Sequence, residues 1–108
     1  MPEKVYNAEN ETQVKGRKRK DEIRRERELN DLRFVMGHEQ GRRFIWRMLA
    51  LTGMHRTSFE TNALSMAMKE GQRNVGLTLT AEIMEADTKS YLTMQLEAQN
   101  LKEIDNAE

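Results

Sequence analysis

The stretch from Leu29 to Leu49 reads LNDLRFVMGHEQGRRFIWRML, and its spacing indicates the fold class. Apolar residues recur in its first part every three or four positions, which is typical of one buried side of a helix. Glycine readily adopts the left-handed conformation of a helix C-cap, so Gly37 is placed to end this helix. We therefore predict a first core helix over about residues 24–36. Its buried side comprises Leu29, Leu32, Val35 and Met36.

A second helix is predicted over about residues 39–52, and Gly53 is placed to stop it. Residues 54–62 are then a connecting loop that Phe59 holds down. Hydroxyl and amide side chains in this loop can cap the next helix. The inner face of the second helix comprises Phe44, Ile45, Met48 and Leu49, and the capping candidates are Thr57, Ser58, Thr61 and Asn62.

Two further helices are predicted over about residues 63–86 and 89–104, with Asp87 or Thr88 capping the second of them. Gly71 and Gly76 interrupt the first, and each costs about 1 kcal/mol relative to alanine. We favour close packing of another backbone over a bend as the reason for these glycines. The expected inner positions are Leu64, Met68, Val75, Leu79 and Ile83 in the first, and Tyr91, Met94, Ala98 and Leu101 in the second, where Leu92 and Leu96 widen the apolar face. The predicted fold class is all-α, a small bundle of about four helices with an extended basic N-terminal arm.

The 108 residues have no net charge, but the two ends of the chain differ in sign. Residues 15–27 hold eight Lys/Arg against three Asp/Glu (8 − 3 = +5), and residues 80–108 hold two against seven (2 − 7 = −5). We divide the chain into residues 1–28, a basic and partly disordered arm or extended helix, and residues 29–108, a helical domain with an acidic C-terminal helix. Residues 1–14 are expected to be extended or disordered, because they lack apolar groups to offset the entropy of ordering.

The basic arm is either a solvated helix or a surface that contacts DNA or an acidic protein. Only non-specific DNA contact is expected, since no DNA-reading motif is evident. The charge asymmetry also suits packing of identical copies, either head-to-tail or isologous. The candidate contact residues are Lys15, Arg17, Lys18, Arg19, Lys20, Arg24 and Arg25.

The chain has no cysteine and two histidines, His38 and His55, whose separation matches no metal-ligand spacing. A surface or capping role is expected for both histidines. Glu82, Glu85 and Asp87 are expected to form a solvated or partner-facing acidic patch rather than a metal site. The glycines form no phosphate-binding pattern. We therefore predict that the protein is not an enzyme and that it has no cofactor and no metal site.

The segment from Gly41 to Arg47 is the most distinctive local stretch. Arg42 and Trp46 lie four residues apart on a helix, so the guanidinium can stack on the indole. Arginine and tryptophan are common anchors of protein interfaces. The alternative is a core helix whose arginines reach out to solvent. The predicted protein-interface residues are Arg42, Arg43, Trp46, Arg47, Tyr91, Met94 and Leu101.

Three blocks of the sequence resemble a family of small virion structural proteins of podoviruses, the short-tailed phages, of the Bordetella-phage type. The blocks are residues 31–36, residues 41–49 with Phe59, and residues 70–77, and the resemblance spans about residues 30–96. It implies a virion-associated role, since the namesake is a minor structural protein encoded among head and portal genes. It implies no activity, cofactor or catalytic residue.

We therefore expect a non-enzymatic virion structural protein, associated with the portal or the inner head, that acts through oligomeric assembly. Its expected partners are portal or other head proteins, further copies of itself and packaged DNA. It would be made in the host cytoplasm, with no membrane in the assembled state, because no secretory signal or membrane span is apparent. The alternatives are a head-internal protein ejected with the genome, and a phage regulator that binds DNA or a host protein.

Overall fold

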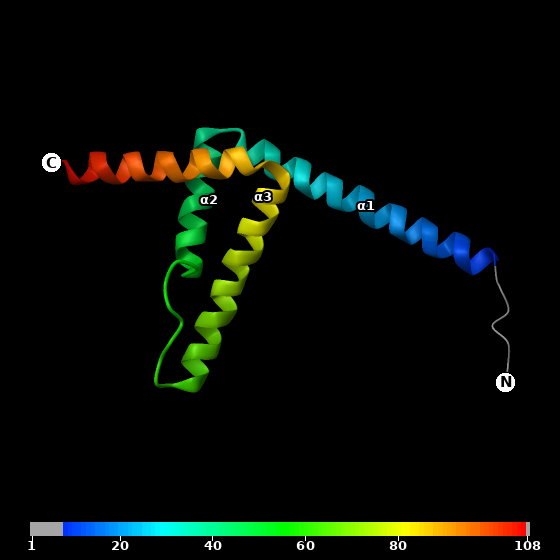
Figure 1. Cartoon of the computed structure of the whole chain (residues 1–108), viewed down its shortest axis with the longest axis horizontal. Coiled ribbons are helices and arrows are strands. Elements are labelled where there is room, and N and C mark those ends of the chain that lie inside the picture. Colours follow the sequence, from blue (N-terminus) through cyan, green and yellow to red (C-terminus); the bar gives the residue numbers. More distant parts are fainter. Residues whose placement is uncertain (1–7, 108) are drawn as a thin grey trace.

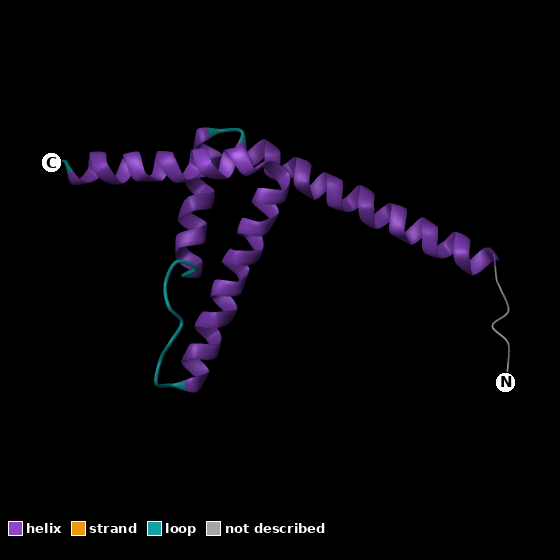
Figure 2. Cartoon of the chain, in the orientation of Figure 1, coloured by secondary structure: helices purple, strands orange, loops and turns teal. Residues whose placement is uncertain are grey.

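The computed structural model describes residues 8–107, which form three helices: α1 (Ala8–Met36), α2 (Glu39–Thr52) and α3 (Ala63–Asn106) (Figure 1). No strand occurs among these residues (Figure 2). The all-α fold class is therefore confirmed, while the prediction of four separate helices is wrong.

The difference in helix number arises at Asp87, where α3 is kinked. Asp87 has non-helical backbone angles (φ −168°, ψ 93°), and its Oδ1 accepts hydrogen bonds from the backbone N–H groups of Lys89 and Ser90. The predicted cap is therefore present. However, the helix resumes at once without a loop, so the two parts remain joined end to end as one bent element. A bundle would need a connection long enough to reverse the chain.

The described chain is flat and open, with extents of 75 × 40 × 15 Å. The first half of α1 and the end of α3 project on opposite sides, and α2 with the first part of α3 forms a hairpin between them (Figure 1). The radius of gyration is 20.6 Å, whereas a compact domain of this length has about 13 Å. The helices therefore enclose only a small common core.

This core lies where the three helices cross, and it is built from the predicted inner faces together with Met54, which was predicted to belong to the connecting loop. Its fully buried side chains are Met36, Leu49, Ile83 and Met94, and it is completed by Met54 and Tyr91. Leu29 is also buried, as predicted. Five predicted inner residues are exposed instead, because no further helix covers their side of α2 or α3: Phe44, Leu64, Met68, Val75 and Leu101.

The glycines have different roles at the helix ends and inside α3. Gly53 adopts the left-handed conformation (φ 69°) that ends α2, as predicted. Gly37 follows the last residue of α1, but it does not have a positive φ, so the left-handed cap predicted there is wrong. A Cβ at Gly76 would lie 3.0 Å from the Cβ atoms of Met54 and Thr52, which confirms close packing there, although by side chains rather than by another backbone. A Cβ at Gly71 would meet open space, so the prediction of close packing at Gly71 is wrong.

The loop between α2 and α3 is held by ion pairs and hydrogen bonds rather than by Phe59, which is exposed. Lys69 pairs with Glu60, and the Ser58 hydroxyl donates to Glu70. Asn62 caps α3, as its residue type predicts, by accepting a hydrogen bond from the backbone N–H of Ser65 over 2.9 Å.

The arm is helical from Ala8 onward, so the extended or disordered conformation expected for residues 8–14 is wrong. Residues 1–7, which belong to the same prediction, lie outside the described residues. Local ion pairs support this polar helix, since charges three or four residues apart are neighbours on its surface. Examples are Lys15 with Glu11 at 3.3 Å and Arg24 with Asp21 at 2.7 Å.

Candidate protein interface

Arg42 on α2 makes polar contacts with both of the other helices. Its Nε lies 2.5 Å from Oε1 of Glu97 on α3, and its Nη1 donates to the carbonyl oxygen of Met36 at the end of α1 over 2.8 Å. The predicted stacking of Arg42 on Trp46 is therefore wrong. The ring of Trp46 packs instead against that of His55, with centroids 5.7 Å apart.

The structure brings five of the seven predicted interface residues to one hollow of about 30 Å³ between α2 and the second part of α3. The five are Arg42, Arg43, Trp46, Met94 and Leu101. Tyr91 and Met94 are buried in the chain's own core. Arg47 is exposed on α2, and its guanidinium lies 5.3 Å from the ring centroid of Phe44. Much of the predicted set thus joins α2 to α3 within one chain.

An exposed apolar surface lies beside this hollow. It is shallow, and Trp46, Leu92 and Leu96 line it together with Gln95 and Gln99. Leu92 is 52% exposed and Leu96 is 63% exposed, while Trp46 is partly buried. We call this surface the Trp46 face. The spacing of the last helix indicated a broad apolar side, but only the crossing of α2 and α3 puts Trp46 next to it.

A second exposed apolar surface runs along the first part of α3, and we call it the α3 stripe. It comprises Leu64, Met68 and Val75, which lie on one side of the helix and are all exposed. Gly71 belongs to the same side and has open space above it. These residues were expected in the core, and their exposure leaves a second side of the hairpin without a covering helix.

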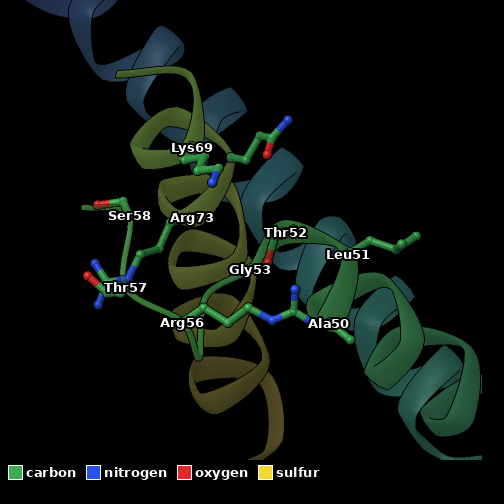
Figure 3. Close-up of a pocket in the computed structure, with 10 residues that line it drawn as sticks. Ala50, Leu51, Thr52, Gly53, Arg56, Thr57, Ser58, Lys69 and Arg73 are labelled. Atoms are coloured by element: carbon green, nitrogen blue, oxygen red, sulfur yellow. The ribbon is translucent and has the colours of Figure 1, made fainter. Parts of the chain in front are cut away.

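A larger hollow of about 160 Å³ lies between the end of α2, the loop and α3 (Figure 3). Its cationic side chains are Arg56 on the loop and Lys69 and Arg73 on α3. Two of these cations already have acidic partners, since Lys69 pairs with Glu60 and Arg73 with Glu70 at 3.5 Å. The hydrogen bond from Lys69 is the main cause that lowers the pKa of Glu60 below its ordinary value. Most of the positive charge of the hollow is therefore neutralised within the loop attachment, and Arg56 is the one lining cation without an ion pair among the described residues.

The acidic cluster near the kink is occupied by contacts within the chain. Arg25 on α1 reaches Glu85 at 2.7 Å and Glu82 at 3.4 Å, while Asp87 caps the second part of α3. The hydrogen bond to Glu85 is the largest cause that raises the pKa of Arg25. Two carboxylates of the predicted partner-facing patch thus anchor α1. Within residues 8–107, no group of three or more potential metal ligands converges.

The basic arm divides into paired and unpaired cations. Lys15, Arg24 and Arg25 have the ion pairs given above. Arg17, Lys18, Arg19 and Lys20 are exposed, and none of them forms an ion pair with a residue that the structure describes. None of the helices described here is both long enough and apolar enough to cross a membrane.

These features define an all-helical protein whose apolar residues are divided between a small internal core and exposed helix faces. The chain belongs to the family of Bbp19-like phage proteins, whose model matches residues 32–95, more than half of its length. The match covers the end of α1, all of α2, and α3 from its start to residue 95, which lies past the kink. It leaves out the basic half of α1. Comparison with curated proteins and with solved structures gives no match.

Proposed function

We propose that this phage protein is a non-enzymatic structural component of the virion that is held at the portal or the inner head. It acts by self-association and by contact with other head proteins. The single observation that carries this proposal is the Trp46 face, on which Leu92 and Leu96 lie exposed beside an indole.

The energetics favour a covered Trp46 face. Burying a leucine side chain completely contributes about 1.5–3 kcal/mol, so covering the exposed halves of Leu92 and Leu96 contributes about 2 kcal/mol. Trp46 adds an aromatic surface of the kind that anchors interfaces. The chain needs this contribution, because its small core stabilises an open shape only weakly. Association therefore supplies burial that one copy does not achieve alone.

The experiment compares two leucine-to-glutamate variants by sedimentation and circular dichroism. Leu96→Glu places a charge on the Trp46 face, so we expect loss of self-association with unchanged helix content. Leu51→Glu is the matched control, since Leu51 is 71% exposed on α2 and lies outside this face. Monomeric wild-type protein at high concentration, or equal behaviour of the two variants, would contradict assembly through this face.

Location is tested separately by mass spectrometry of purified phage particles. A portal-bound or head-bound structural protein stays in particles that have ejected their DNA. A protein ejected with the genome is present in full particles and lost from emptied ones. A regulator is absent from both. Absence from full particles would contradict the proposed structural role.

The exposed cations of α1 favour a second candidate function, which is contact with DNA. This contact is compatible with a structural protein inside the head, because packaged DNA is the polyanion closest to it. A head location and DNA contact therefore support one another, although each has its own test.

A further inference from the structure

Four basic residues form one line along α1. Arg17, Lys20, Arg24 and Arg27 follow at spacings of three, four and three, which places them on one side of the helix. All four are exposed. We call this line the basic stripe.

The opposite side of the same helix is mixed in charge. The corresponding series is Glu11, Lys15, Lys18, Glu22 and Glu26. Lys15 pairs with Glu11, and Glu26 accepts from Arg33 over 2.9 Å. Cations therefore occur on both sides of the arm, but only in the basic stripe is every position of the series basic, whereas the opposite series is mixed in sign.

The core determines where the basic stripe points. The side of α1 that meets α3 comprises Arg25, Leu29, Leu32 and Met36, spaced by four, three and four. Since α1 is one unbroken helix from Ala8 to Met36, this side sets the direction in which every other position of α1 faces. Lys20 and Arg27 fall nearly opposite to it, at about 100° per residue. The stripe thus faces away from the rest of the molecule, and the first half of α1 stands clear of α2 and α3 (Figure 1).

The acidic end of the chain is a poor partner for the stripe of a second copy. Of its seven acidic residues, Glu82 and Glu85 pair with Arg25, and Glu97 pairs with Arg42. Asp87 uses its carboxylate to cap the helix beyond the kink. Four of the seven carboxylates thus serve contacts within the chain, which favours a polyanion from outside it.

We propose that the basic stripe binds the phosphate backbone of duplex DNA without sequence preference. From Arg17 to Arg27 the stripe is about 15 Å long, and a duplex carries one negative charge per about 1.7 Å of its axis. Both partners are rigid rods, so contact requires little loss of conformational freedom. Binding of DNA by the basic stripe does not depend on the proposed function. The statement that the bound DNA is the packaged genome does rest on the proposed function.

The test measures binding of the full chain to a fluorescent 25-base-pair duplex by anisotropy over a range of salt concentrations. The stripe variant is Arg17→Gln, Lys20→Gln and Arg27→Gln, with Arg24 kept because it pairs with Asp21. The matched control is Lys15→Gln, Lys18→Gln and Arg19→Gln. Each removes three positive charges from the arm, and glutamine preserves helix propensity. Circular dichroism confirms that both remain helical.

We expect the stripe variant to reduce the slope of log K against log salt concentration by about 2.7, and affinity at low salt by at least about tenfold. The control should change the slope by less than about one. Equal losses in both variants would overturn the stripe, since overall charge would then suffice. Salt-independent binding or no binding by the wild type would also overturn it. So would a stripe variant that loses self-association but still binds DNA, because the partner would then be a second copy.

The particle experiment separates this inference from the proposed function. Salt-dependent, stripe-dependent DNA binding by a protein absent from particles would contradict only the virion role. A protein present in particles that does not bind duplex DNA would contradict only the basic stripe.

Discussion

The guanidinium of Arg42 joins all three helices, because it contacts Glu97 on α3 and the carbonyl oxygen of Met36 at the end of α1. The last carbonyls of a helix have no partner within it, so Arg42 satisfies one of these groups for α1. The two charged side chains are only 17% and 25% exposed. Arg42, which was predicted from the sequence to be an interface residue, therefore connects helices within one chain.

Replacing Arg42 by lysine should lower the free energy of unfolding by about 2 kcal/mol. An ammonium group cannot reproduce the forked geometry that reaches Glu97 and Met36 together. Arg43→Lys is the control, since Arg43 forms a long, exposed pair with Glu39 at 3.8 Å, and such pairs contribute little. Urea denaturation followed by circular dichroism measures both variants. Equal stability of the two would show that Arg42 does not connect the helices.

The two glycines of α3 should respond in opposite ways to alanine. Gly76→Ala places a Cβ against Met54 and Thr52, so we expect a loss of about 1–3 kcal/mol. Gly71→Ala meets open space inside a helix and should stabilise the protein by about 0.5–1 kcal/mol. Thermal unfolding distinguishes them. A shift of the melting temperature in the same direction for both would contradict the close contact of α2 and its loop with α3.

The cap at the kink can be tested by two changes of one residue. Asp87→Ala removes the acceptor of the Lys89 and Ser90 N–H groups and should cost about 1 kcal/mol. Asp87→Asn keeps an acceptor and should retain most of this stability. Amide hydrogen exchange at Lys89 and Ser90 should accelerate only in the alanine variant. Unchanged exchange there would show that the kink needs no cap.

The loop attachment should weaken in acid. The pKa of Glu60 is lowered in the folded state, mainly by the hydrogen bond from Lys69, so its contribution is fully present above the unfolded pKa of about 4.3. It is lost as the pH falls through the lower folded value. The protection of residues 57–62 against hydrogen exchange, measured relative to the intrinsic rate at each pH, should therefore decrease as the pH falls through this lowered pKa. Glu60→Gln should show fast exchange in this loop already at neutral pH. Equal protection of the loop in the glutamine variant and the wild type would contradict a role of the Glu60–Lys69 ion pair in holding the loop.

Local chemistry explains why several features were predictable from the sequence. The C-terminal end of α2 depends on Gly53, and the start of α3 depends on Asn62. The type of each residue determines the backbone conformation that it favours. Asp87 marks the break in α3 for the same reason. The repeating positions of Met36 and Leu49 identify the sides that enter the core.

Features that depend on neighbouring elements were not predictable in this way. Leu64 and Val75 have the spacing of an inner face, yet they are exposed because α3 bends at Asp87 and continues without a loop, so its second part does not reverse to cover them. Arg42 and Trp46 share one side of α2, but Glu97 competes for the guanidinium and His55 for the indole. Periodicity shows which residues share a side, but not what lies opposite that side.

The amino-acid sequence alone determined that this chain is helical, where α1 ends, where α2 starts and stops, where α3 starts, and that the charge of the chain is divided between its ends. These properties follow from backbone preferences and from the order of residues. Only the tertiary structure decided that the acidic end is used by Arg25 and Arg42, and that the basic stripe of α1 faces outward. The physical reason is that pairing and burial depend on distances between segments far apart in the chain, which the packing of α1 and α2 against α3 establishes.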